Sequence, residues 1–173
     1  MQAAHDLAWL NSLPAGDAVV QLLQCCGSQR WATQMAAARP FPTIDSAIET
    51  AGEIWWSLDR SDWLEAFRSH PKIGEQKAAD AVTAKAQAWS SHEQAGVTAA
   101  SNETIDSLAT LNRAYDEKFG YIFIICATGK TSEEMLAALR ERIQHDAATE
   151  LPVAAAEQSQ ITVLRLKKLL TSA

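Results

Sequence analysis

One histidine of the chain stands in a rigid backbone setting. His70 precedes Pro71, and a proline fixes its own φ angle and keeps the residue before it out of the helical region. The imidazole is therefore held in a reproducible direction, and histidine suits proton transfer near neutral pH. His70 is thus a candidate general acid or base, although a His-Pro pair also serves simply to end a helix.

A second group of polar side chains follows within 25 residues. Ser90, Glu93 and Gln94 share one face of a helix, because they are spaced at i, i+3 and i+4. A hydroxyl, a carboxylate and an amide on one face suit a small heterocycle with several N–H and C=O groups. Ser-x-x-Glu is also the capping box of a helix start. The two interpretations are compatible, since a helix start offers free N–H groups to an anion.

A third candidate is an arginine near the C-terminus. Ile161, Arg165 and Leu169 form one row on a helix at i, i+4 and i+8. An arginine is almost never buried without a partner, so Arg165 is expected to meet a carboxylate, either an internal Asp or Glu or that of a ligand. A side chain that reaches back to solvent is the alternative. Arg142 is a rival anion contact, but it lies only at the edge of its apolar stripe.

The remaining reactive side chains show no metal or cofactor pattern. The histidines lack close ligand spacing, and Cys25, Cys26 and Cys126 contain no C-x-x-C pair. A Gly-rich phosphate loop and a G-x-S-x-G elbow are also absent from the sequence. We therefore expect no metal and no cofactor. The odd number of cysteines indicates reduced thiols, and with the lack of a basic leader segment it predicts a cytoplasmic protein.

The elements that position these residues are expected to be helices, because strong helix formers dominate and the chain has only 7 Gly and 5 Pro. The expected helices span residues 17–26, 30–38, 45–58, 59–69, 75–89, 104–118, 131–146 and 152–170. Asp45 is the expected cap of the third helix and Pro152 the expected start of the last one. The apolar segment Tyr121–Ala127 is either a buried helical turn or an extended connector. The fold class predicted is all-α, a single compact domain over residues 1–173 with about eight or nine helices.

Apolar residues at helical spacing indicate which faces are buried. For residues 104–118 and the position just after them, the expected stripe is Ile105, Leu108, Leu111, Tyr115 and Phe119. For residues 131–146 it is Met135, Leu136, Leu139 and Ile143. Four tryptophans are expected in the core or at a subunit interface, namely Trp31, Trp55, Trp56 and Trp63.

Bulk composition excludes several classes of partner. The chain has 173 residues and a formal net charge of -6, which argues against a nucleic-acid-binding surface. Its longest apolar run, Tyr121–Ala127, falls far short of the ~20 residues that span a bilayer. A small molecule, rather than nucleic acid or membrane, is the expected partner.

These segments together resemble one family, 2-oxo-4-hydroxy-4-carboxy-5-ureidoimidazoline (OHCU) decarboxylase. The features that carry the resemblance occur in the family's order and cover nearly the whole chain. They are Asn11-Ser12-Leu13, Arg39-Pro40-Phe41, Ser69-His70-Pro71, Ser90-x-x-Glu93-Gln94, Phe119-Gly120-Tyr121-Ile122-Phe123 and Leu164-Arg165-Leu166. One departure is His145, where the family pattern has asparagine.

The resemblance implies a cofactor-free decarboxylase that forms (S)-allantoin in urate degradation, with an all-α fold and a homodimeric assembly. It implies that His70 and Glu93 are catalytic. The positions it implies for substrate binding are Pro71, Ser90, Gln94, Phe123, Ile125, Ala127 and Arg165, with backbone groups acting over the segment from Phe123 to Ala127. Two alternatives of other classes are a helical interaction module without activity and a metal-free hydrolase of a related ureide.

Overall fold

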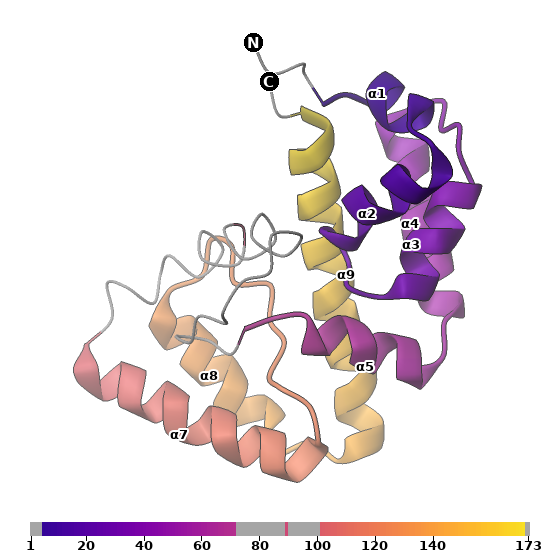
Figure 1. Cartoon of the computed structure of the whole chain (residues 1–173). Coiled ribbons are helices and arrows are strands. Elements are labelled where there is room, and N and C mark those ends of the chain that lie inside the picture. Colours follow the sequence, from indigo (N-terminus) through magenta and orange to yellow (C-terminus); the bar gives the residue numbers. More distant parts are fainter. Residues whose placement is uncertain (1–4, 72–88, 90–100, 172–173) are drawn as a thin grey trace. The chain divides into compact units, whose positions relative to one another are not determined.

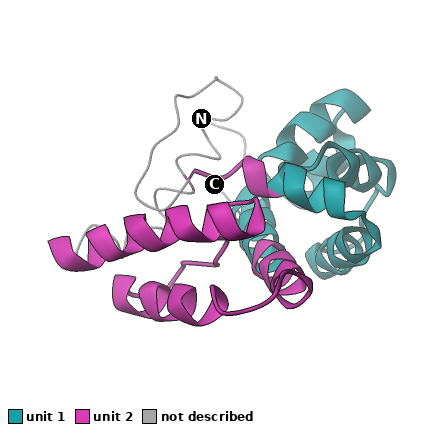
Figure 2. Cartoon of the chain, turned by 90° about the horizontal axis from the view of Figure 1, so that it is seen from below, with its two compact units in different colours: residues 1–66, 159–173 teal, residues 67–158 magenta. Residues whose placement is uncertain are grey.

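The computed structural model describes residues 5–71, 89 and 101–171. Those residues contain eight α-helices and no β-strand (Figure 1), so the predicted all-α class is confirmed. The helix expected over residues 75–89 lies outside the described residues, apart from position 89. The chain divides into two compact units, one made of Met1–Ala66 with Ser159–Ala173 and the other of Phe67–Gln158 (Figure 2).

The first unit contains α1 (Leu7–Ser12), α2 (Ala15–Leu23), α3 (Gln29–Ala37) and α4 (Ile44–Ser57). It also includes most of α5 (Arg60–Arg68) and the C-terminal part of α9 (Ala147–Thr171). Helix α3 packs against both α2 and α4.

Capping side chains explain where the sequence-based boundaries of this unit were wrong. Helix α1 was not expected, and it starts where the Asp6 carboxylate accepts a hydrogen bond from the Trp9 N–H. Helix α4 is capped by Thr43, in a reciprocal capping box with Ser46, so Asp45 lies in the first turn and is not the cap. An Asp in the first turn still stabilises the positive end of the helix dipole.

The core of the first unit contains two of the four tryptophans singled out. Trp31 and Trp55 are buried, and the Trp31 indole N–H donates to the Ala51 carbonyl at 3.1 Å. Trp63 is half-buried and donates to the Trp55 carbonyl at 2.9 Å. Trp56 differs, because 49% of it is exposed.

Two of the sequence motifs hold the start of this unit together. The Asn11 side chain exchanges two hydrogen bonds with the backbone of Phe41, at 2.8 and 2.9 Å. The Arg39 guanidinium donates to the carbonyls of Leu10 and Leu13. The Asn-Ser-Leu and Arg-Pro-Phe segments are therefore structural partners.

The second unit contains α7 (Asn102–Phe119), α8 (Ser132–Arg142) and the N-terminal part of α9. Helices α7 and α8 pack against each other. The buried stripe of α7 consists of Leu108, Asn112, Tyr115 and Phe119. The expected stripe was wrong at its start, because Ile105 is 37% exposed.

Helix α8 is shorter than expected. It is capped by Thr131, ends at Arg142 rather than Asp146, and leaves Ile143 half-buried. The chain turns here because Asp146 caps α9, its carboxylate accepting from the Thr149 N–H at 2.7 Å. The hydrogen bonds from Thr149 hold the pKa of Asp146 below its usual range.

Helix α9 begins five residues before the expected start. Pro152 lies inside the helix. It lies in the second turn, where a proline removes one intrahelical hydrogen bond.

Residues Tyr121–Ala127 form a non-helical connector between α7 and α8, which confirms the second of the two interpretations of this segment (Figure 1). The chain enters the connector through Gly120, whose φ of 77° is readily adopted by glycine. Every connector residue is buried except Ile122, which is half-buried.

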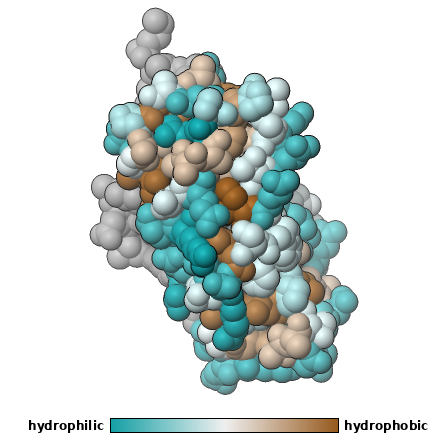
Figure 3. All heavy atoms as spheres, turned by 90° about the vertical axis from the view of Figure 1, so that its right-hand side faces the viewer, coloured by the Kyte–Doolittle hydropathy of each residue, from teal (hydrophilic) through white to brown (hydrophobic). Residues whose placement is uncertain are grey.

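The outer surface carries both hydrophobic and hydrophilic side chains. On the face drawn in Figure 3, hydrophobic residues are interspersed with hydrophilic ones. Among the described residues, none of the helices is long and apolar enough to cross a membrane.

Candidate active site

His70 is buried at the point where the chain leaves α5. Its exposed fraction is 7%, and its backbone N–H donates to the Phe67 carbonyl at 3.2 Å. The ring Nε2 lies 2.7 Å from the Gln158 side-chain oxygen. Because that oxygen accepts, Nε2 carries the hydrogen, and in the neutral ring Nδ1 carries the lone pair. The ring is thereby fixed in both orientation and tautomer.

Gln158 was missed by the sequence analysis. It is fully buried on α9, and it precedes Ile161 by three residues and Arg165 by seven. It therefore continues the buried row that had singled out Arg165. An amide within an apolar stripe was the signal that could have found it, since a buried polar side chain requires a partner.

The connector holds three of the predicted substrate contacts: Phe123, Ile125 and Ala127 are all buried. The residues between them are bonded to neighbouring helices. The Ile124 carbonyl accepts from Arg142 Nη1 at 2.7 Å, and the Cys126 N–H donates to Glu157 Oε2 at 2.7 Å. In an extended chain the N–H and C=O of successive residues point to opposite sides. Extended geometry would turn the backbone groups of Phe123 and Ile125 away from these two partners.

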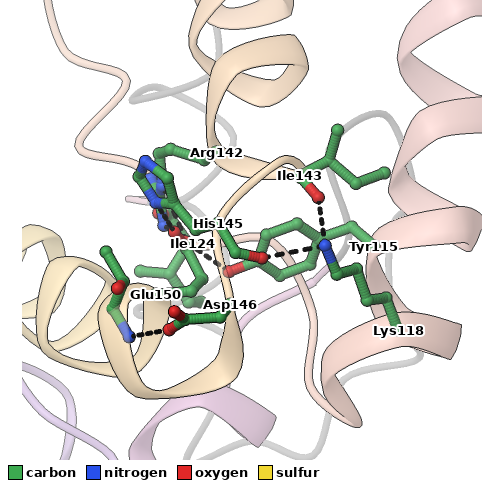
Figure 4. A network of polar contacts seen from close by, with 9 residues as sticks. Tyr115, Lys118, Ile124, Arg142, Ile143, His145, Asp146 and Glu150 are labelled. Atoms are coloured by element: carbon green, nitrogen blue, oxygen red, sulfur yellow. Dashed lines mark hydrogen bonds and ion pairs between the residues drawn. The ribbon is translucent and has the colours of Figure 1, made fainter.

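A buried polar network lies behind the connector (Figure 4). Its centre is Glu150, which is fully buried. Its Oε1 accepts from Tyr115 Oη at 2.5 Å and from Arg142 Nε and Nη2 at 2.8 and 2.5 Å. Its Oε2 lies 2.8 Å from His145 Nδ1. Burial and the hydrogen bond to Glu150 raise the pKa of Tyr115, so the phenol remains a donor.

Arg142 is buried rather than at the edge of its helix face, contrary to the expectation from its stripe. All three of its guanidinium nitrogens donate within the unit, two to Glu150 and one to the Ile124 carbonyl. The guanidinium also lies 4.5 Å from the centre of the Phe123 ring. These contacts assign Arg142 to the scaffold that supports the connector.

Arg165 lies in the first unit and is 3% exposed. The row predicted from the sequence is real, because Ile161 and Leu169 are buried as well. Arg165 Nη1 donates to the Gln24 carbonyl at 3.4 Å. Its charge is also felt by Cys26, whose thiol nevertheless has a pKa raised to about 12 by burial. That thiol is therefore protonated and a poor nucleophile at neutral pH.

Of the four other predicted site residues, the structure describes only Pro71. Pro71 is half-buried next to His70. Ser90, Glu93 and Gln94 lie outside the described residues. Their roles, like those of Phe123, Ile125, Ala127 and Arg165, stay predictions.

The fold and the His70 site define a helical protein that holds a buried histidine through a buried amide and has a buried non-helical connector in the same unit. The model of the OHCU decarboxylase family matches residues 11–167, and the chain belongs to this family.

Individual relatives agree with this assignment. The chain is 42% identical over 146 residues to the uric acid degradation bifunctional protein TTL of Arabidopsis thaliana, covering 84% of this chain and 45% of that protein. It is 31% identical over 135 residues to the 2-oxo-4-hydroxy-4-carboxy-5-ureidoimidazoline decarboxylase of Amia calva, covering 78% and 76%. The chain spans less than half the length of the bifunctional relatives from Arabidopsis thaliana and two Bacillus strains.

A solved structure is similar as well. The chain matches a crystal structure of an OHCU decarboxylase in the presence of (S)-allantoin with a TM-score of 0.75 and 40% identity. The match covers 87% of this chain and 97% of the other.

Proposed function

We propose that this chain decarboxylates OHCU to (S)-allantoin in urate degradation, without a cofactor. The observation that carries the proposal is the buried His70, held by Pro71 and Gln158 in a chain of the OHCU decarboxylase family. A histidine fixed in one tautomer suits the transfer of a proton to or from one defined atom.

The reaction needs little beyond positioning and proton transfer. The bond between the ring carbon and the carboxylate carbon breaks, and carbon dioxide leaves. The electron pair moves toward the adjacent C=N bond, which is conjugated with the urea group and acts as the sink that a cofactor supplies in other decarboxylases. The ring nitrogen takes up a proton, which leaves an enol at the carbon that lost the carboxylate. The ring carbon that carries the ureido group then accepts a proton on one face, while the 4-hydroxyl loses its proton and becomes the ring carbonyl. Selection of that face makes a single enantiomer of allantoin.

The roles of the side chains follow from this chemistry. His70 is the general acid or base, and Glu93 is its partner or the acceptor for the 4-hydroxyl group. Arg165 holds an anionic or carbonyl oxygen through its planar guanidinium. Ser90 and Gln94 bind the ureido edge, and Pro71 lines the substrate.

The connector supplies the remaining contacts through Phe123, Ile125 and Ala127. Two hydrogen bonds support this role of the connector. The Ile124 carbonyl accepts from Arg142, and the Cys126 N–H donates to Glu157. In an extended chain the groups of Phe123 and Ile125 would point the other way, toward the substrate.

The assembly and the location are part of the proposal. We infer a homodimer from the family resemblance, and the exposed Trp56 is suited to an interface. We infer a cytoplasmic protein from the three cysteines, which are free thiols. Sedimentation analysis tests the dimer, which a monomeric species at micromolar concentration would contradict.

The activity is tested by making the unstable substrate in place. Urate oxidase oxidises urate, and 5-hydroxyisourate hydrolase hydrolyses the oxidation product to OHCU. The protein is then added, and circular dichroism follows the formation of allantoin. Rapid appearance of one allantoin enantiomer is the expected result. A slow rise of racemic product, the same as without the protein, would contradict the proposed function.

The His70→Asn variant tests the mechanism in the same assay. Loss of a general acid or base lowers the rate by ~10²–10⁴-fold, and the variant is expected to remain folded. His5→Asn is the matched control, because His5 stacks on Trp9 and has no role in the proposed mechanism. A His70→Asn variant with near-normal turnover would remove His70 from the mechanism.

A further inference from the structure

Side chains of neighbouring elements hold the connector at two described positions, Ile124 and Cys126. Arg142 donates to the Ile124 carbonyl at 2.7 Å, and Glu157 accepts from the Cys126 N–H at 2.7 Å. Lys130 Nζ donates to the Cys126 carbonyl at 2.8 Å. Helix α8 thus holds the connector at Ile124, and helix α9 holds it at Cys126.

The Arg142 anchor is itself well fixed. Arg142 is held by two hydrogen bonds to the fully buried Glu150 (Figure 4). Its guanidinium also lies over the Phe123 ring. A planar guanidinium with three engaged nitrogens has little freedom to rotate. Glu157 lies on the same helix as Glu150, two turns further on, and is half-buried.

Two neighbouring residues of α9, Glu157 and Gln158, bind different segments of the second unit. Glu157 holds the connector through Cys126, and the next residue, Gln158, holds His70 through Nε2. Because they are neighbours on one helix, the spacing between the connector and the histidine ring is set by α9.

We propose that Glu157 and Arg142 are positioning residues for substrate binding: they bond Cys126 and Ile124 so that the backbone groups of Phe123 and Ile125 face the substrate. This rests on the proposed function. Neither residue touches the reacting atoms. They act through the backbone that they hold, so they are expected to affect substrate affinity more than the chemical step.

Glu157 gives the sharper test, because it is half-buried and its loss leaves no stranded partner charge among its described contacts. Glu157→Ala removes the acceptor for the Cys126 N–H, whereas Glu157→Gln keeps a side-chain oxygen in the same place. Glu134→Ala is the matched control. Its carboxylate accepts one backbone N–H, from Thr131 at 2.8 Å, in the same unit but off the connector.

The expected result is a split between the two kinetic constants. Loss of a hydrogen bond to a charged group corresponds to a ~10–100-fold effect, and we expect it in KM, with kcat within about threefold of the parent value. Glu157→Gln is expected to restore most of the affinity. Glu134→Ala is expected to lower the melting temperature while KM stays unchanged. An unchanged KM in Glu157→Ala would overturn the proposal, as would a loss of kcat alone.

Amide NMR signals test the alternation without turnover. On titration with (S)-allantoin, the N–H signals of Phe123 and Ile125 are expected to shift more than those of Ile124 and Cys126. In Glu157→Ala this selective pattern is expected to weaken. Equal shifts at all four amides, or larger shifts at Ile124 and Cys126, would overturn the proposed facing of the connector.

Arg142→Lys tests the second anchor, since lysine keeps the charge but lacks the fork that reaches Glu150 and Ile124 together. A raised KM with a nearly constant kcat is expected. The two levels of inference fail separately. A parent protein that does not accelerate decarboxylation refutes the proposed function, whereas an active parent with insensitive Glu157 and Arg142 variants refutes only the positioning role.

Discussion

Glu150→Gln probes the network behind the connector with almost no change in shape. Glu150 is fully buried, and its partner Arg142 is 6% exposed. A glutamine can still present an oxygen to the Arg142 and Tyr115 donors, but it carries no charge. The substitution therefore leaves the Arg142 cation buried without its counterion.

The size of the effect follows from this burial. Removing one partner of a buried ion pair costs ~3–5 kcal/mol, because the other charge is left uncompensated. For a chain of this size, 1 kcal/mol corresponds to ~2–4 °C in melting temperature. We therefore expect Glu150→Gln to melt ~6–20 °C below the parent protein.

Thermal melts followed by circular dichroism, with urea unfolding as a second measure, provide the assay. The double variant Arg142→Met/Glu150→Leu serves as the comparison, because it removes both charges together. Its loss of stability is expected to be smaller than the sum of the losses in Arg142→Met and Glu150→Leu, because neither charge is left buried without its counterion.

The reasoning fails under two results. One is a melting temperature of Glu150→Gln within ~2 °C of the parent, which would mean that Arg142 does not need a charged partner. The other is a double variant whose loss equals the sum of the two single losses, which would mean that the two residues act independently.

Three further predictions concern the site itself. Gln158→Glu places a carboxylate beside Nε2 of His70 and favours the charged ring, so the His70 limb of the pH–kcat profile is expected to move up by ~1–3 pH units; an unchanged profile would exclude Gln158 as the partner that matters. Arg165→Lys keeps the charge but loses the planar fork, so KM is expected to rise about tenfold or more, and intact affinity would assign Arg165 to the scaffold. Dialysis against EDTA is expected to leave turnover unchanged, because the substrate supplies its own electron sink; activity that returns only with added zinc would contradict this.

The helices were predictable because their signal is local. Composition and apolar spacing located seven of the eight described helices to within a few residues, apart from the start of α9 and the end of α8. The errors fall at helix ends, where single hydrogen bonds decide. Thr43 and Asp146 cap α4 and α9 through side chains whose role depends on local geometry.

Burial was predicted less well where it depends on neighbouring elements. Periodicity placed Ile105 inside, yet it is exposed, and it placed Arg142 at an edge, yet it is buried. A period specifies which residues share a face of a helix. The width of the buried stripe is set by what packs against it, which a single sequence does not contain.

The sequence by itself determined the all-α class, the rigid His70-Pro71 pair and the buried row that includes Arg165, because each depends on residues close together along the chain. Only the tertiary structure decided that Gln158 holds His70 and that Glu157 and Arg142 hold the connector. Gln158 and His70 are 88 residues apart, and Glu157 and Cys126 are 31 apart. Such hydrogen bonds form only when packing of the apolar faces has brought the helices together, so their partners cannot be predicted from local spacing.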